Sequence, residues 1–209
     1  MDYLEQLVKR YPALKACEAD IRSAYNILER SYEQGGKLFV AGNGGSAADS
    51  GHIVGELMKS FIKKRIPERH FLEKIFSIDN ETGNYLDNKL ENGLPAISLC
   101  EHTALMTATL NDVDGNAVFA QQIYCLGVKG DVFLGISTSG NSRNIVYAMV
   151  VAKAKALHTI ALTGRSGGKA SSIADASIII PEQETYRIQE LHLPVYHALC
   201  LQLEDHFFK

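Results

Sequence analysis

The sequence predicts an α/β fold, a three-layer sandwich in which helices flank a mostly parallel, five-stranded sheet. Short apolar runs alternate with longer stretches whose apolar residues follow helical spacing. Two of these runs lead directly into loops of glycine and small polar residues that open a helix. The chain has 209 residues and 46% hydrophobic content, which suits one domain with a sizeable core.

The first 34 residues are predicted to form helices appended to this fold. Their apolar residues recur at helical spacing, and Pro12 either starts a second helix or kinks the first. Because these helices precede the first strand, they are not crossovers. We expect them to pack outside the sheet or against another subunit, and Gly35-Gly36 to end them.

Alternating strands and helices make up most of the remaining chain. The pattern weakens between residues 62 and 94, where turn residues interrupt it, and predicts an irregular, partly helical insertion. This insertion is either a surface excursion or a lid or substrate-selecting loop. The predicted strands are 37–41, 95–99, 131–137, 158–164 and 177–180, and the helices after the insertion are about 101–110, 117–126, 142–156, a short helix to 174, and 186–208.

Composition excludes several classes of partner. A net charge of −3 gives no electrostatic case for nucleic acid or an anionic membrane, and the basic cluster Lys63-Lys64-Arg65 is expected to be solvated. The N-terminus does not resemble a signal peptide, and no apolar run is long enough to span a bilayer. The cysteines are scattered without a CxxC pair, which favours a reducing cytoplasm. They are Cys17, Cys100, Cys125 and Cys200.

The stretch from Ala41 to Glu56, AGNGGSAADSGHIVGE, predicts an anion site between a strand and a helix. We expect Gly42, Gly44 and Gly45 to turn the backbone with positive φ and to let a ligand approach closely. Ser46 is expected to cap the helix and to offer its hydroxyl to a phosphate. Turns of this kind also serve as plain connections, so a phosphate role needs support from elsewhere in the chain.

His52 and Glu56 follow on the same predicted helix, about 40° apart around its axis. They are candidates for acid-base or metal chemistry, or else a solvated, helix-stabilising pair. A second polar loop, Ser137 to Ser142, also stands at a strand's carboxyl end, where ligands bind in open α/β sheets. It favours phosphate binding over a purely structural role. The absence of GK[ST] and GxGxxG patterns argues against a nucleotide cofactor.

The last predicted helix carries a third set of polar residues. His197 lies about 20° from Glu190 and about 80° from Gln189 around the helix, so either residue could share a face with it. A buried, hydrogen-bonded histidine is the other interpretation of His197. His192 lies about 140° from His197, on a different face.

Taken together, GNGGSAAD, His52, Glu56, STSGNS and RIQE followed by His197 resemble the sugar isomerase (SIS) domain family, and within it the bacterial phosphoheptose isomerases. The resemblance covers nearly the whole chain outside the insertion. It implies a sugar phosphate substrate, a homotetramer with active sites where subunits meet, and a zinc ion held by His52, Glu56, Gln189 and His197. It therefore selects Gln189 over Glu190. The substrate-binding residues it implies are Asn43, Gly44, Gly45, Glu56, Asn111, Asp112, Ser137, Thr138, Ser139, Ser142 and Gln189.

The reaction implied by the resemblance is an aldose-ketose isomerisation, from sedoheptulose 7-phosphate to D-glycero-D-manno-heptose 7-phosphate through an enediolate. Glu56 is the expected base and His197 the expected acid, from the same or a neighbouring subunit. A bound zinc ion would polarise the carbonyl. The insertion departs from the better-known members, so another phosphosugar is one alternative. A non-catalytic SIS module that binds a phosphosugar or a protein is the other, although it has no need of these four residues.

Overall fold

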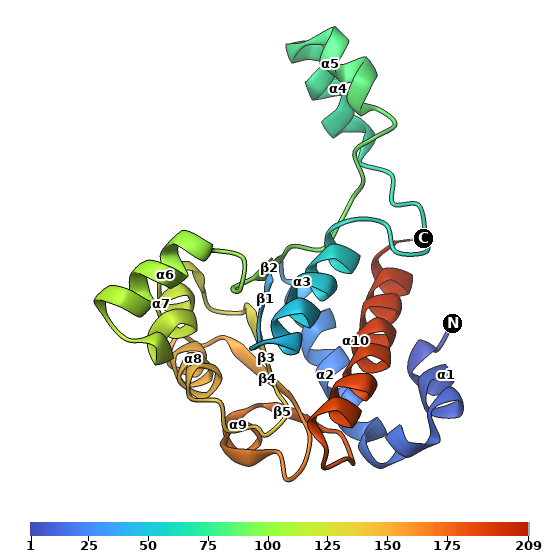
Figure 1. Ribbon diagram of the computed structural model, residues 1–209. Helices are drawn as coiled ribbons and strands as arrows, with labels where there is room; N and C mark the ends of the chain where they lie inside the picture. The colour runs from blue at the N-terminus through green and yellow to red at the C-terminus, as the bar shows by residue number, and fades with distance from the viewer. Residues whose placement is uncertain (209) are drawn as a thin grey trace.

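Figure 1 shows the protein as a computed structural model that describes residues 1–208. Across these residues the chain forms a five-stranded sheet with the order β2-β1-β3-β4-β5, and every neighbouring pair is parallel. The predicted sheet is therefore confirmed. Its strands are β1 (Leu38–Ala41), β2 (Ala96–Ser98), β3 (Val132–Ser137), β4 (His158–Thr163) and β5 (Ala176–Ile179).

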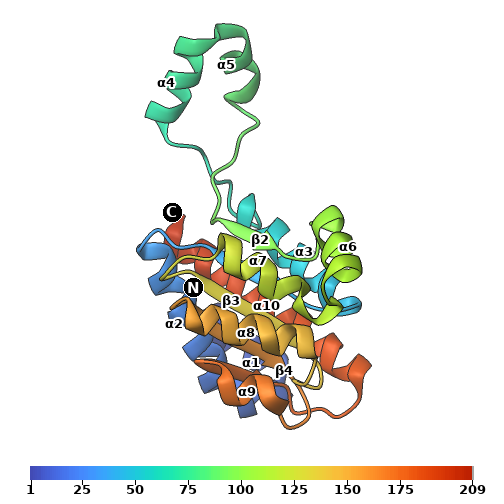
Figure 2. The same cartoon turned by 90° about the vertical axis from the view of Figure 1, so that its left-hand side faces the viewer.

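Helices cover both faces of the sheet and give the predicted three layers (Figures 1 and 2). Side chains alternate along a strand, so Leu134 of β3 joins the apolar core on one face and Phe133 the core on the other. The first face carries α1 (Tyr3–Arg10), α2 (Glu18–Glu33), α3 (Gly45–Met58) and α10 (Thr185–Phe207), and the second carries α6 (Thr103–Asp112), α7 (Val118–Leu126), α8 (Arg143–Ala154) and α9 (Gly168–Ile173).

The N-terminal helices belong to the first of these layers. Pro12 occupies the first turn of a short 3-10 helix, Pro12–Cys17, and so starts a second helix between α1 and α2. Ile21 and Leu28 of α2 are buried in the core with residues of the strands. The N-terminal helices were expected outside the sheet or against another subunit; α2 packs directly on one face of the sheet.

An arm of two helices stands away from the body between α3 and β2 (Figures 1 and 2). It consists of α4 (Arg69–Ile78) and α5 (Asn80–Leu86), which pack on each other. Leu72 is the buried residue of α4, and Gly83 that of α5. Asp79 ends α4, and its side chain accepts a hydrogen bond from the Thr82 N–H, which caps α5. The predicted insertion is thus more regularly helical than its turn residues indicated.

The cysteines and the helices were also the subject of expectations from the sequence. Cys17 and Cys200 are buried and, like Cys100 and Cys125, form no disulfide within the described part of the chain. None of the helices in residues 1–208 combines the length and the apolar character that a bilayer crossing requires.

His192 is a core residue of α10 rather than a site residue. It is 0% exposed, and its Nε2 lies 3.3 Å from the carbonyl oxygen of Thr163 on β4. Its Nδ1 has no hydrogen-bond partner among residues 1–208. Burial lowers the pKa of this imidazole to about 4, although the hydrogen bond to Thr163 opposes the change. The separate face that helix geometry assigned to His192 is confirmed.

The buried His192 predicts a pH-dependent stability. In the unfolded chain its imidazole binds a proton near pH 6.5, but in the folded chain only near pH 4. The free energy of unfolding is therefore unaffected by this imidazole above pH 6.5. It decreases as the pH falls below 6.5, by about 3 kcal/mol at pH 4, because the unfolded chain binds a proton that the folded chain excludes. Urea unfolding between pH 7.5 and pH 4.5 measures this loss. In His192→Gln that part of the dependence disappears; parallel curves for the two proteins would contradict the assignment.

Candidate active site

The order of the strands creates a crevice between β1 and β3. In the sheet, β2 lies on one side of β1, and β3 lies on the other. The connection that follows β1 and the connection that follows β3 therefore run toward opposite edges of the sheet, which leaves a crevice between them. The side-chain amides of Asn43, after β1, and Asn144, in the first turn of α8, exchange two hydrogen bonds of 3.1 and 2.8 Å. The two polar loops therefore meet in this crevice, as their positions predicted. Asn144 was missed, although it directly follows the second loop.

In the glycine-rich loop after β1, only one of the three predicted glycines has a positive φ. Gly44 has a φ of 57° and is the N-cap of α3, but Gly42 and Gly45 do not have positive φ. Gly42 is needed for space, because a Cβ there would lie 2.4 Å from the Ser46 carbonyl oxygen. Ser46 is buried inside the first turn of α3, so the expectation that it caps the helix is wrong. The helix begins without a side-chain cap, as an anion site permits.

The second loop is fixed by its own hydroxyls and by a neighbouring loop. Ser142 is the N-cap of α8, and its Oγ lies 3.0 Å from the Oγ of Ser137. Gly140 has a φ of 65°, and a Cβ there would collide with the Gly167 carbonyl oxygen at 1.8 Å. Thr138 and Ser139 are half-buried between these points. The loop therefore presents its hydroxyls from a rigid backbone.

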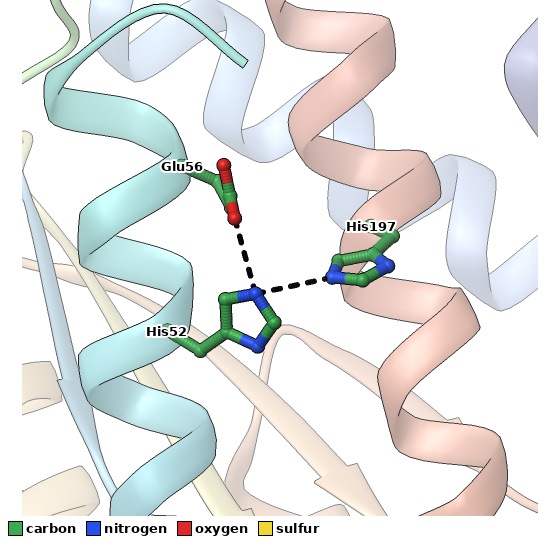
Figure 3. Close-up of side chains that lie close together, drawn as sticks. All are labelled: His52, Glu56 and His197. Carbon is green, nitrogen blue, oxygen red and sulfur yellow. Dashed lines mark hydrogen bonds and ion pairs between the residues drawn. The ribbon is translucent and has the colours of Figure 1, made fainter. Parts of the chain in front are cut away.

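A second group of polar side chains joins α3 to α10 (Figure 3). His52 Nε2 lies 3.1 Å from Glu56 Oε1 on α3 and 3.4 Å from His197 Nε2 on α10. In residues 1–208 one atom from each of the three side chains falls within 4.8 Å of the others. The phenyl ring of Phe61 packs beside His197, with 5.5 Å between ring centroids. The structure thus brings together three of the four predicted zinc ligands.

Tyr196 and Asp49, which the sequence analysis missed, orient His52. The Tyr196 hydroxyl donates to Asp49 Oδ1 at 3.2 Å and lies 3.0 Å from His52 Nδ1. Burial, together with Asp49, raises the pKa of Tyr196, so the phenol keeps its proton. The hydroxyl oxygen can still accept a hydrogen bond, so a proton on His52 Nδ1 would complete a chain from His52 through Tyr196 to Asp49. The other ring nitrogen, Nε2, lies beside Glu56 and His197.

This arrangement gathers two imidazole nitrogens and a carboxylate oxygen. Burial lowers the pKa of His197, His52 lowers it further and Glu56 opposes both, so the His197 imidazole is neutral at neutral pH. Imidazole nitrogens and a carboxylate oxygen are a ligand set that zinc takes in open catalytic sites. The same distances also allow a hydrogen bond from a proton on one of these nitrogen or oxygen atoms, without a metal. The group therefore suits proton transfer, metal binding or both.

The other predicted residues lie outside this group. Gln189 is half-buried beside Gly45, where a Cβ would lie 2.9 Å from its Nε2, and eight residues place it ~12 Å from His197 along α10. Glu190 lines a cavity of about 330 Å³ together with His197. Asn111 and Asp112 are exposed at the end of α6, bonded to each other at 2.7 Å, in the opposite helix layer. One chain therefore does not assemble every predicted residue.

The polar loops at the crevice and the His52–Glu56–His197 group lie at different positions along the axis of α3. Gly45, at the crevice, and His52 are seven residues apart, which corresponds to ~10 Å along the helix axis. The loops at the crevice suit an anion, and the His52–Glu56–His197 group suits proton or metal chemistry. A ligand that reaches both must therefore be elongated, with a phosphate at one end and its reacting carbons at the other.

The sequence is similar to a known protein family over most of its length. A family model described as SIS domain matches residues 86–164. The phosphoheptose isomerase of Thermodesulfovibrio yellowstonii is 38% identical over 189 residues, which cover 90% of this chain and 81% of that protein. The phosphoheptose isomerase of Helicobacter pylori strain Shi470 is also 38% identical, over 93% of this chain and 88% of the relative.

Solved structures show the same likeness over the whole fold. The phosphoheptose isomerase of Neisseria gonorrhoeae matches with a TM-score of 0.75 and 31% identity, over 96% of this chain and 94% of its own. That of Francisella tularensis matches with a TM-score of 0.77 and 29% identity, over 97% and 95%. The similarity therefore spans both helix layers and the sheet.

Proposed function

The chain belongs to the phosphoheptose isomerase family, and we propose that it interconverts sedoheptulose 7-phosphate and D-glycero-D-manno-heptose 7-phosphate. The observation that carries this proposal is the His52–Glu56–His197 group, placed two helical turns beyond the anion-binding crevice. A binding module has no need of such a group, which disfavours the non-catalytic alternative.

Substrate binding begins at the crevice between β1 and β3. The hydroxyls of Ser137, Ser139 and Ser142 and the free start of α3 at Gly45 supply donors for the phosphate. Gln189 lies beside Gly45 and is proposed to donate its amide to the sugar. Neither Asn43–Ser46 nor Ser137–Ser142 contains a basic residue, so these loops hold the phosphate by neutral hydrogen bonds and it can leave. The sugar then extends along α3 toward Glu56.

Glu56 is proposed to move the proton. Its carboxylate takes a proton from the carbon next to the carbonyl, which gives an enediolate, and returns it to the neighbouring carbon. Its side chain is 15% exposed, so it is largely buried but still reached by solvent. His197 faces the oxygens as the acid. Its lowered pKa leaves the imidazole neutral, so it acts through its ring N–H, which donates to a developing alkoxide.

The donor set fits a zinc ion held by His52, Glu56 and His197. Such an ion supplies polarisation of the carbonyl and stabilisation of negative charge on oxygen. Gln189 of the same chain lies at the crevice instead, so His52, Glu56 and His197 would hold the ion. An electron pair of Glu56 that held the ion would not be available as the base, so tight binding of zinc by Glu56 would oppose its role in proton transfer.

A homotetramer with shared sites accounts for the residues that one chain leaves apart. Asn111 and Asp112 lie in the opposite helix layer from His197, so within one chain they have no route to the substrate. We infer that they reach the site of a neighbouring copy. The cavity beside His197, lined by Tyr3 and Arg10 of α1, leaves that side of the site open in one chain. Cytoplasmic location stays a prediction from composition.

Replacement of the proposed base tests the mechanism. Glu56→Gln keeps the size of the side chain but removes its basicity, so we expect kcat to fall about a thousandfold. Affinity for sedoheptulose 7-phosphate is expected to change less than about threefold, because the phosphate loops are untouched. Turnover is followed by NMR and binding by calorimetry. Glu190→Gln, the same change outside the group, is the matched control and keeps its rate. A near-normal kcat in Glu56→Gln would remove Glu56 as the base.

Zinc affinity tests the metal proposal independently of turnover. Tyr196→Phe removes the hydroxyl that orients His52, and we expect zinc to bind about tenfold to a hundredfold more weakly. Calorimetry with zinc alone measures this affinity. Tyr186→Phe changes an exposed tyrosine on the same helix and serves as the control. Equal affinities in the wild type and Tyr196→Phe would show that the hydroxyl does not orient a ligand.

A further inference from the structure

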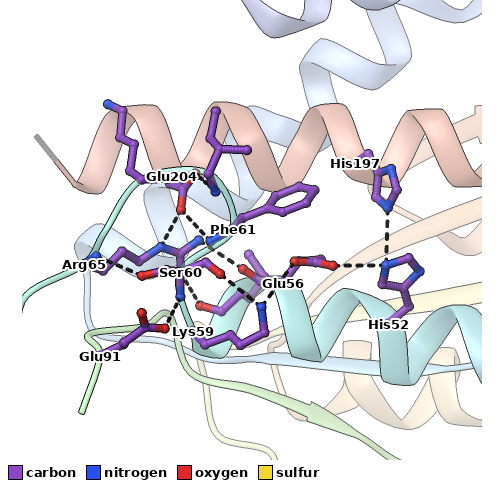
Figure 4. A network of polar contacts seen from close by, with 12 residues as sticks. His52, Glu56, Lys59, Ser60, Phe61, Arg65, Glu91, His197 and Glu204 are labelled. Atoms are coloured by element: carbon purple, nitrogen blue, oxygen red, sulfur yellow. Dashed lines mark hydrogen bonds and ion pairs between the residues drawn. The ribbon is translucent and has the colours of Figure 1, made fainter. Parts of the chain in front are cut away.

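A buried ion pair joins the end of α3 to the end of α10 (Figure 4). Arg65 Nε lies 2.8 Å from Glu204 Oε1, and the two side chains are 0% and 1% exposed. The sequence analysis expected Arg65 to be solvated, which is wrong. Two charges removed from water stabilise a fold only when their other hydrogen-bonding groups are satisfied as well. Among the remaining partners of the two side chains are the backbone of Glu56 and that of Phe61, which packs against His197.

Arg65 binds the last turn of α3, the turn that carries the proposed base. Its Nη2 donates to the Glu56 carbonyl oxygen at 3.0 Å, and its Nη1 donates to that of Leu57 at 2.6 Å. These are among the last four carbonyls of α3, which no helical N–H satisfies. The helix ends at Met58, two residues after Glu56. The guanidinium therefore caps this turn, together with the Leu94 N–H, which also donates to the Leu57 carbonyl oxygen at 2.9 Å.

Glu204 holds the segment that supports the proposed acid. Its Oε1 accepts the Phe61 N–H at 2.9 Å, and its Oε2 accepts the Ile62 N–H at 3.0 Å. Burial raises the pKa of Glu204, but these hydrogen bonds and the guanidinium outweigh burial and hold the pKa below its usual range. The carboxylate stays charged. The Phe61 ring, fixed in this way, packs against His197.

The same arginine closes the root of the arm. The Arg65 carbonyl oxygen accepts the Asn92 N–H at 2.8 Å, and the Arg65 N–H donates to Ser60 Oγ at 2.9 Å. The Ser60 N–H in turn donates to Glu91 Oε2 at 2.9 Å. The segments that lead into and out of the arm are therefore hydrogen-bonded to each other beside the point where Arg65 binds the end of α3.

We propose that Arg65 and Glu204 are positioning residues for the isomerisation, an inference that rests on the proposed function. Neither side chain touches the substrate. The pair fixes the backbone of Glu56 from one side and Phe61 from the other, so that base and acid keep their separation. Displacement of a catalytic group by about 1 Å costs about a hundredfold in rate. The last turn of a helix is where such displacement comes most easily.

The test uses the double variant Arg65→Met/Glu204→Gln in the full chain. Removal of one partner alone leaves an unpaired buried charge and risks unfolding. In the double variant no buried charge is left, and the amide oxygen of the new side chain still accepts the Phe61 N–H. The variant removes the hydrogen bonds to the Glu56 and Leu57 carbonyls and the contact of Arg65 with the Phe208 ring. It also removes the second carboxylate oxygen, which accepts the Ile62 and Lys63 N–H groups, so the position of the last turn of α3 is read directly from its crystal structure. The control, Lys153→Met/Asp175→Asn, removes a partly exposed pair of 2.6 Å beside β5, far from the site.

Two readouts decide the inference. In a variant whose circular dichroism shows a folded protein, we expect kcat to fall about tenfold to a hundredfold while KM changes less than about threefold. Its crystal structure is expected to lose the contact between Glu56 Oε1 and His52 Nε2. The control keeps both. An unchanged kcat with an unmoved last turn of α3 would overturn the inference. If the wild type itself turns over no heptose phosphate, the proposed function fails, and the crystal structure alone decides the positioning role.

Discussion

The parallel packing of α3 against α10 is the interaction on which the rest of the site depends. Ile53 and Leu57 of α3 and Val195 and Leu199 of α10 are buried in one apolar core over the sheet. Since both helices run the same way, their polar residues meet at successive heights. Gly45 meets Gln189, and His52 meets His197. Past the end of α3, Arg65 meets Glu204. The apolar interface between α3 and α10 thus determines which polar residues of the two segments face each other.

This register separates binding from chemistry along a single helix. The start of α3 lies at the crevice that the strand order opens, and the favourable dipole there suits a phosphate. Its last turns, where the backbone dipole favours positive charge, carry Glu56 beside two imidazoles. A substrate long enough to span both ends is fixed by one and converted at the other. Heptose phosphates satisfy this requirement, whereas a short phosphosugar bound at the crevice would end before Glu56.

Periodicity predicted the fold well, because strands and helices depend on patterns that lie within a few residues. It also placed His52 with Glu56 and separated His192 from His197. It did not identify Asp49 and Tyr196, since their roles depend on contacts between distant helices. Arg65 looked like part of a solvated basic cluster for the same reason: its partner Glu204 stands 139 residues further on. The angles around α10 left Gln189 and Glu190 open, and the structure places Gln189 at the crevice and Glu190 near His197.

The central claim is that Glu56 passes a proton between two carbons of a bound heptose phosphate. The most direct measurement is NMR of sedoheptulose 7-phosphate with the wild-type enzyme in D₂O, with added zinc and with chelator. The account predicts formation of an aldoheptose 7-phosphate that carries deuterium on the carbon next to its aldehyde, because a carboxylate exchanges its proton with solvent during the enediolate step. Binding of the sugar phosphate with neither product nor deuterium incorporation, in either condition, would contradict it.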